Sequence, residues 1–253
     1  RQLVSDPQVD VDGLDLLYHV RDYDLAKNGG TTQIHLRNLD TGETRQLTTQ
    51  GSNFNARWSP KDTEIAFLST RSGSVQIHRI PQFGGEAVQV TDFDGGISNM
   101  SWSPDGKWFA FTSDVQLDPQ VRDLFEDLPM AEAAIYDDLM VRHWDTWKDG
   151  TYSHLFVVPA EGGEPIDLME GMRVDTPLKP FGGGEQICWT PDSKGLVYTA
   201  KVVDEPQTST NSDLFHVTLE EREHVNLTQG MPGYEIEPSF SPDGTQLAFC
   251  SMA

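Results

Sequence analysis

The pattern of apolar and polar positions repeats along this chain. At four places an apolar residue is followed by Ser or Thr and then Pro, then by a polar turn and a short run of β-forming residues. The four copies begin at Trp58, Trp102, Trp189 and Phe240. Proline ends a strand because it cannot donate to the ladder, and the Asp-Gly of two copies is a hairpin-turn dipeptide. The pattern therefore predicts a strand on each side of a tight turn in every copy.

Two further strands follow each predicted pair. In the second copy, residues 75–79 alternate apolar and polar side chains, Gly84-Gly85-Glu86 makes a turn, and residues 87–91 form a shorter strand. A repeat of about 45 residues with four strands is typical of a propeller blade. We therefore predict an all-β chain, a β-propeller of four-stranded antiparallel blades. The core between blades is expected to contain Trp102, Phe109, Phe111, Trp189 and Phe240.

The spacing of the copies sets the number of blades. Successive copies lie 44, 87 and 51 residues apart, and a degenerate copy at residues 9–18 precedes them. We assign blades to residues 3–49, 50–92, 93–170 and 171–229, and a half blade to residues 230–253. This assignment gives about four and a half blades, which is an incomplete propeller. Because natural domains avoid open strand edges, we expect the chain to be a piece of a longer protein. A four-bladed ring closed by strands from the start of the chain is the alternative.

The third blade carries an insertion over residues 113–152. Its alanine-rich part, residues 130–134, predicts a helical turn, and Lys148-Asp149-Gly150 predicts a turn before the next strand. Long insertions in compact domains are usually functional or disordered, and the aromatic content here argues against disorder. We therefore expect an ordered hairpin that projects from the third blade.

The charge and the missing motifs narrow the function. The chain has 18 basic and 40 acidic residues, a net charge of −22, which disfavours nucleic acid and is compatible with a cationic group such as a peptide's free amino terminus. No apolar run approaches the roughly 18 residues of a membrane span. The sequence has no Gly-x-Ser-x-Gly, His-Glu-x-x-His or Cys-x-x-Cys. We therefore predict no catalytic residue, no metal ligand and no cofactor in this chain. We interpret Asp105, Asp192 and Asp243 as side chains that cap their own turns.

The repeats resemble those of TolB-like proteins and of the prolyl oligopeptidase family. The segment from Tyr136 to Trp147 is more specific, and it is similar to the propeller hairpin of dipeptidyl-peptidase 5 type enzymes, also labelled acylaminoacyl-peptidase-like. The resemblance covers residues 3–253. It implies an N-terminal propeller that caps a C-terminal α/β-hydrolase domain with a Ser-Asp-His triad, in a secreted or periplasmic peptidase that removes dipeptides from oligopeptide amino termini. No triad residue can be assigned in this chain.

The hairpin supplies the candidate substrate-binding residues. A dipeptide-releasing enzyme has to bind a free amino terminus, which is a cation, and a carboxylate in a site shielded from water does this best. The candidate acids are Asp137, Asp138 and Asp145, with Glu126 and Glu132 ranked behind them. Arg142 is expected to hold an acid or a peptide carbonyl, and Trp144 and Trp147 are expected to wall the site. The alternative is a rigid strut with no role in binding.

Three functions remain open on the sequence. The first is the non-catalytic propeller portion of a serine exopeptidase, which gates access and helps to anchor the substrate's amino end, and which is inactive by itself. The second is a stand-alone TolB-like propeller that binds another protein. The third is a propeller enzyme that uses its own carboxylates, such as a glycosidase or a lyase.

Overall fold

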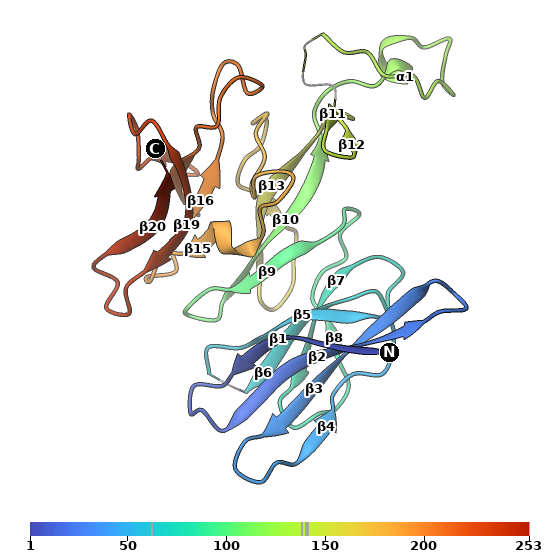
Figure 1. Cartoon of the computed structure of the whole chain (residues 1–253), viewed down its shortest axis with the longest axis vertical. Helices are drawn as coiled ribbons and strands as arrows, with labels where there is room; N and C mark the ends of the chain where they lie inside the picture. The colour runs from blue at the N-terminus through green and yellow to red at the C-terminus, as the bar shows by residue number, and fades with distance from the viewer. Residues whose placement is uncertain (62, 138, 140–141, 253) are drawn as a thin grey trace. The chain divides into compact units, whose positions relative to one another are not determined.

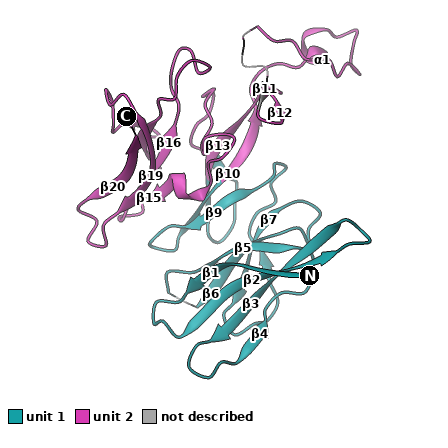
Figure 2. Ribbon diagram, in the orientation of Figure 1, with its two compact units in different colours: residues 1–111, 157–166 teal, residues 112–156, 167–253 magenta. Residues whose placement is uncertain are grey.

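The structure is a computed structural model that describes every residue except 62, 138, 140, 141 and 253 (Figure 1). Its residues form two compact units (Figure 2). The first unit contains residues 1–111 and 157–166, and the second contains residues 112–156 and 167–253. Among the described residues, no helix combines the length and the apolar character that crossing a membrane requires.

The first unit contains two antiparallel sheets of four strands each, and both confirm the predicted blade pattern. The first sheet has the order β1-β2-β3-β4, with β1 (Gln2–Val9), β2 (Asp15–Asp24), β3 (Gly29–Asn38) and β4 (Thr44–Gln46). The second has the order β5-β6-β7-β8, with β5 (Asn53–Trp58), β6 (Glu64–Ser69), β7 (Gln76–Pro81) and β8 (Val88–Gln89).

The second unit contains one complete sheet and one pair of strands. The sheet has the order β15-β16-β17-β18, with β15 (Ile187–Trp189), β16 (Gly195–Ala200), β17 (Asp213–Thr218) and β18 (His224–Asn226). A short 3-10 helix, η1 (Gly184–Gln186), precedes it. The pair consists of β19 (Tyr234–Phe240) and β20 (Leu247–Met252). These two strands correspond to the predicted half blade.

One further four-stranded sheet has strands that fall in both units. Its order is β14-β13-β10-β9, with β9 (Ser98–Trp102), β10 (Trp108–Gln116), β13 (Thr151–Pro159) and β14 (Ile166–Asp167). The insertion lies between β10 and β13. It holds α1 (Val121–Leu124) and a separate hairpin of β11 (Arg142–His143) and β12 (Thr146–Trp147). The hairpin insertion is confirmed, whereas the helical turn expected at residues 130–134 is wrong. The only α-helix among the described residues is α1, whose amino end is closed by a capping box of Gln120 and Asp123.

The buried aromatic side chains follow the repeat in part. Phe109 and Phe111 are fully buried and Trp189 nearly so, as expected, whereas Trp102 and Phe240 are only half-buried. Within the first unit, apolar side chains of neighbouring sheets form one cluster that includes Leu17, Ile34, Ala56, Ile65 and Phe67. Burial of these strand faces against each other is the main stabilising contribution to the sheets.

The polar residues of the repeat close the turns. The Ser103 hydroxyl donates to Asp105 Oδ1 at 2.7 Å and accepts from the Trp108 amide at 3.0 Å. Thr190 and Asp192, and Ser241 and Asp243, form the same contact at 2.6 and 2.5 Å. Each Asp also accepts a backbone N–H two residues further on. The three Asp residues therefore cap their own turns, as the sequence predicts.

A second feature of the repeat stands several residues before the turn in four of the five copies. Asp6, Asn55, Asn99 and Glu237 have φ between 50° and 59° and lie three residues before Val9, Trp58, Trp102 and Phe240, the first residues of these copies, whereas the copy at Trp189 lacks the feature. In β1, β5 and β19 the strand register shifts at this point, which marks a β-bulge. Two of these side chains bond to a strand of another sheet, and all four residues involved lie in the first unit. Asp6 binds Arg57 Nη1 at 2.8 Å, and Asn55 Nδ2 donates to the Met100 carbonyl at 2.9 Å.

Candidate substrate-binding site

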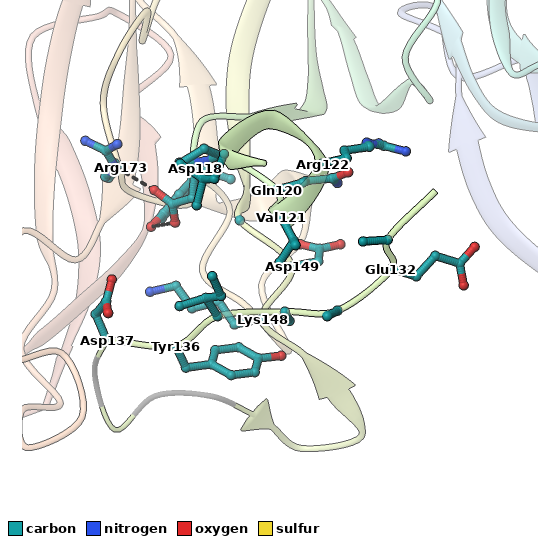
Figure 3. A pocket seen from close by; sticks show the side chains of 18 residues that line it. Asp118, Gln120, Val121, Arg122, Glu132, Tyr136, Asp137, Lys148, Asp149 and Arg173 are labelled. Atoms are coloured by element: carbon teal, nitrogen blue, oxygen red, sulfur yellow. Dashed lines mark hydrogen bonds and ion pairs between the residues drawn. The ribbon is translucent and has the colours of Figure 1, made fainter. Parts of the chain in front are cut away.

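A cavity of about 690 Å³ lies within the insertion of the second unit (Figure 3). This volume falls in the range of small-molecule and cofactor pockets. Its walls come from residues around α1, from the extended stretch 131–137, from the start of β13, and from Arg173. Segments distant in sequence therefore build one concave site.

Asp118 holds these segments together. Its Oδ1 accepts from Arg173 Nε at 2.7 Å, and its Oδ2 accepts from the Tyr152 hydroxyl at 3.1 Å. Both carboxylate oxygens are thus engaged by donors from other parts of the chain. The Gln116 side-chain amide adds bonds to the carbonyls of Asp118 at 2.7 Å and Asp149 at 3.1 Å.

Gly150 allows the two ends of the insertion to meet. Its carbonyl accepts the amides of Leu117 at 3.0 Å and Asp118 at 3.2 Å, and its φ is +82°. A Cβ at this position would lie 2.6 Å from Gln116 Nε2 and 2.8 Å from Asp118 Cβ. Only glycine combines this backbone conformation with so close an approach. The predicted turn at residues 148–150 therefore also closes one wall of the cavity.

Two ionisable groups of the wall have shifted pKa values. Burial would raise the pKa of Asp149, but hydrogen bonds from the Thr151 hydroxyl and amide, at 2.6 and 3.0 Å, outweigh it and lower the pKa. Burial is the main cause that raises the pKa of Tyr152. The charge of Lys148 opposes this shift, and the charge and hydrogen bond of Asp118 add to it. At neutral pH the wall therefore presents a carboxylate at Asp149 and a neutral phenol at Tyr152.

Asp137 and Glu132 differ from the other acids of the cavity. Both are exposed and line the cavity, and neither carboxylate makes a hydrogen bond or ion pair with another described residue. Asp118 and Asp149, in contrast, are committed to groups of the protein itself. A cationic ligand in this cavity would therefore find its counter-charge at Asp137 or Glu132.

The structure distributes the predicted site residues over two places. Asp137 lines the cavity, and Asp138 lies outside the described residues. The other four, Arg142, Trp144, Asp145 and Trp147, belong to the β11–β12 hairpin and are not among the cavity's lining residues.

Within the hairpin the predicted residues contact each other. The Arg142 guanidinium lies 5.3 Å from the centre of the Trp147 ring, and its Nε donates to the Trp144 carbonyl at 3.2 Å. Asp145 accepts from the Thr146 hydroxyl at 3.3 Å. The Trp144 side chain is 71% exposed and meets Phe181 edge-to-face at 5.5 Å between ring centres. That the two tryptophans wall a binding site stays a prediction.

Sequence reasoning missed Asp118, Tyr152 and Arg173 as parts of the site. Arg173 lies 55 residues beyond Asp118, and nothing in the repeat pattern pairs them. The sequence shows that Tyr152 is close to the Lys148–Gly150 turn. It does not show that the amides of Leu117 and Asp118 bond to the Gly150 carbonyl and so bring the turn to Asp118. In the part of the chain that the structure describes, no three His, Cys, Asp or Glu side chains gather as a metal site would require.

Comparison with known proteins identifies relatives of the chain and structures of similar fold. No protein-family profile matches the chain. Dipeptidyl-peptidase 5 of Porphyromonas gingivalis is 34% identical over 98% of the chain, and dipeptidyl-peptidase 5 of Porphyromonas endodontalis is 36% identical over 95%. The chain is homologous to the dipeptidyl-peptidase 5 proteins. A probable dipeptidyl-peptidase 5 of the fungus Arthroderma benhamiae is 26% identical over 94% of the chain.

The chain spans about a third of these relatives, 37% of the Porphyromonas gingivalis protein and 36% of each of the others. Among solved structures, the acylaminoacyl peptidase of Pyrococcus horikoshii matches 93% of the chain with a TM-score of 0.68 and 16% identity, and 34% of that protein is covered. TolB from Agrobacterium tumefaciens matches 100% of the chain and 91% of its own length, with a TM-score of 0.52 and 14% identity. At these identities the structural matches show the fold alone, and the fold is that of a peptidase or TolB propeller.

Proposed function

We propose that this chain is the propeller portion of a serine exopeptidase that releases dipeptides from the amino termini of oligopeptides. The observation that carries the proposal is the 34% identity to dipeptidyl-peptidase 5 over 98% of the chain. The triad would lie in a C-terminal α/β-hydrolase domain of the same protein, which is the chain's main partner. In a periplasmic or secreted peptidase, the propeller would admit extended oligopeptides and exclude folded proteins.

The insertion's role in this proposal is to bind the substrate's amino end. The cavity offers two exposed carboxylates with no partner among the described residues, Asp137 and Glu132. Asp137 belongs to the segment whose sequence resembles the dipeptidyl-peptidase hairpin. A carboxylate that receives a primary ammonium there forms a charge-assisted hydrogen bond, among the stronger polar contacts in proteins. Asp137 is therefore the first candidate anchor, with Asp138 and Asp145 kept as predictions.

The test is the reaction of the intact protein on defined peptides. Oligopeptides of about six residues, with a free or an acetylated amino end, are incubated with the enzyme and the products are identified by mass spectrometry. Successive release of dipeptides from the free peptide, with none from the acetylated one, supports the proposal. Release of single amino acids, internal cleavage, or equal cleavage of both peptides contradicts it.

The competing function is a stand-alone propeller that binds a protein. Its support is the TolB match over 100% of the chain, at 14% identity. The much higher identity to dipeptidyl-peptidase 5 favours the peptidase. A reading frame that ends without a Gly-x-Ser-x-Gly motif would reverse that preference.

A further inference from the structure

We propose that an aromatic pair, Trp144 and Phe181, binds the side chain of the substrate's first residue and favours apolar side chains there. The proposal rests on the proposed function for the identity of the peptide. It goes further in assigning a second contact, outside the lining of the cavity, that selects among peptides. The class of ligand is a peptide whose amino-terminal residue carries an aromatic or a large aliphatic side chain.

The first observation is the conformation of Trp144 at the tip of the β11–β12 hairpin. His143 pairs with Thr146, so Trp144 and Asp145 alone form the turn. The φ of Trp144 is +58°, which suits glycine or asparagine and strains a bulky residue. Its ring is largely exposed, so burial does not compensate for this strain. Strained residues of this kind gather at binding and catalytic sites, which indicates that the indole is displayed for a ligand.

Arg142 holds the displayed residue in place. Its Nε donates to the Trp144 carbonyl at 3.2 Å, and its guanidinium lies 5.3 Å from the centre of the Trp147 ring. The tip is therefore braced from within the hairpin. Because like charges repel, a peptide with Lys or Arg at its first position should bind beside Arg142 less well than an apolar one.

Phe181 supplies the second ring from another segment of the same unit. It lies between β14 and η1, its side chain is 77% exposed, and it meets Trp144 edge-to-face at 5.5 Å between ring centres. The segment is anchored by Lys179, whose Nζ lies 3.0 Å from Asp114 Oδ1 in β10. Two large apolar rings are thus held together in solvent. Gathered apolar groups on a surface mark binding sites, and aromatic rings add specific contacts to a third apolar group.

The occupant is inferred from the chain segments that carry the two rings. The hairpin continues through Trp147 into residues 148–150, which line the cavity, and the segment that carries Phe181 also contributes Arg173 to that lining. Asp137, the proposed partner of the substrate's ammonium, lines the same cavity. The first side chain of a peptide is attached to the carbon that bears the ammonium. It is therefore the side chain closest to this anchor and the one that we assign to the aromatic pair.

The experiment compares dipeptidyl p-nitroanilides as substrates of the intact protein. The first residue is Ala, Leu, Phe or Lys, and the second is Ala throughout. We expect kcat/KM to be about tenfold or more higher for Phe than for Ala at the first position, and higher for Leu than for Lys. Trp144→Gly should bring the Phe-to-Ala ratio close to one, and Phe181→Ala should lower it. The control Phe83→Ala removes a ring that is 84% exposed in the first unit, and it should keep the ratio of the wild type.

Two further measurements exclude a merely structural role of the indole. Glycine suits the positive φ at this position, so Trp144→Gly should unfold thermally at the same temperature as the wild type or higher. Loss of selectivity in a protein of unchanged stability is not a folding defect. A second series keeps Ala at the first position and varies the second among Ala, Leu and Phe. Its ratios should be the same in Trp144→Gly as in the wild type.

The outcomes separate this inference from the proposed function. If dipeptides are released but the Phe-to-Ala ratio is near one in the wild type, or survives Trp144→Gly, the aromatic site is wrong and the peptidase stands. Altered ratios in the second series alone also overturn the assignment to the first residue. Equal slowing of all substrates would show that the rings pack against the rest of the protein, and a changed oligomeric state would show contact with a second copy; either result contradicts the inference. If no substrate with a free amino end releases a dipeptide, the proposed function fails and the aromatic site fails with it.

Discussion

Arg173 Nε lies 2.7 Å from Asp118 Oδ1, and this ion pair joins two segments 55 residues apart at the edge of the cavity. Tyr152 donates to the other carboxylate oxygen at 3.1 Å. Asp118 therefore connects separate segments of the insertion, and its carboxylate binds Arg173 and Tyr152 instead of a ligand.

The first prediction concerns the titration of Tyr152. Burial is the largest cause of its raised pKa, and the charge and hydrogen bond of Asp118 add to it. Asp118→Asn removes that charge, so the pKa of Tyr152 should fall. The change is measured by ¹³C NMR of labelled tyrosines, with Tyr152→Phe assigning the signal. An unchanged titration in Asp118→Asn would show that the contact is not formed in solution.

The second prediction concerns Gly150. Gly150→Ala should lower the free energy of unfolding by about 2–4 kcal/mol, because alanine is strained at positive φ and its Cβ would meet Gln116 and Asp118. Gly171→Ala is the matched control in the same unit. Its φ is +78°, and nothing lies within 4 Å of the added Cβ, so about 1 kcal/mol is expected. Equal losses in denaturant titrations of the two variants would contradict the close packing at Gly150.

The third prediction concerns the bulge residue Asn55. Asn55→Gly loses the bond to the Met100 carbonyl but keeps a backbone suited to φ of +51°, and it should cost about 1 kcal/mol. Asn55→Ala loses the same bond and adds strain at positive φ, so about 2–3 kcal/mol is expected. The free energies of unfolding should rank the wild type above glycine and glycine above alanine. If the Asn55→Ala variant is as stable as Asn55→Gly, the backbone at the bulge changes to relieve the strain, and the prediction is wrong.

Part of the fold, including these bulges, could be predicted from the sequence, and part of the site could not. The turns and strand pairs were predictable because proline, Asp-Gly and short apolar runs fix them locally. The bulge residues also recur at a fixed distance before the first residue of four of the five copies, a spacing that the sequence itself displays. The cavity could not be predicted, because Arg173 and Asp118 lie 55 residues apart and nothing in the repeat pairs them. The helical turn expected at residues 130–134 does not form, because helix propensity over five residues does not offset the cost of starting a helix. The helix α1 begins instead after Gln120, where a capping box with Asp123 closes its amino end.

The third blade lacks a hydrogen-bond pattern that the other complete sheets share, and a histidine occupies the corresponding position. In each of the other three complete sheets, a threonine hydroxyl accepts a hydrogen bond from a backbone amide of the third strand. The same hydroxyl donates to the side chain of the residue that precedes this amide in the sequence. The pairs are Thr48 with Gln33, Thr91 with Gln76, and Thr228 with Asp213. Here the Leu155 amide meets Met169 Sδ at 3.4 Å, and His154 takes the position of Gln33. Its Nδ1 lies 2.8 Å from Asp167, and its Nε2 lies 2.7 Å from the Met172 carbonyl.

The fourth prediction concerns the pKa of His154 and the pH dependence of stability that follows from it. Burial opposes the charged form of His154, but Asp167, the Met172 carbonyl and Asp175 together raise its pKa. Its stabilisation is therefore complete below the unfolded value of about 6.5 and is lost as pH rises through the folded-state pKa. His154→Gln should remove this component from unfolding free energies measured between pH 5.5 and 8.5.

His78 supplies the control of opposite sign. Burial is the main cause that lowers its pKa, with Arg71 adding to the shift and the Gln76 carbonyl opposing it. The contribution of neutral His78 to the free energy of unfolding is complete above the unfolded-state pKa of about 6.5, and it is lost as pH falls through the folded-state pKa. His78→Gln should therefore change the pH dependence on the acid side. The same change in both variants would show that neither shift is specific to its site.

The most direct test of the central claim is the Michaelis constant of Asp137→Asn in the intact enzyme. Loss of a charge-assisted contact to the substrate's ammonium should raise KM about tenfold or more for dipeptidyl substrates with a free amino end. Substrates with a blocked amino end should be unaffected, and Asp145→Asn, at a candidate acid outside the cavity lining, should raise KM less than Asp137→Asn. If Asp137→Asn keeps normal kinetics on free-amino substrates and loses only thermal stability, the insertion is a strut and the anchoring account is wrong.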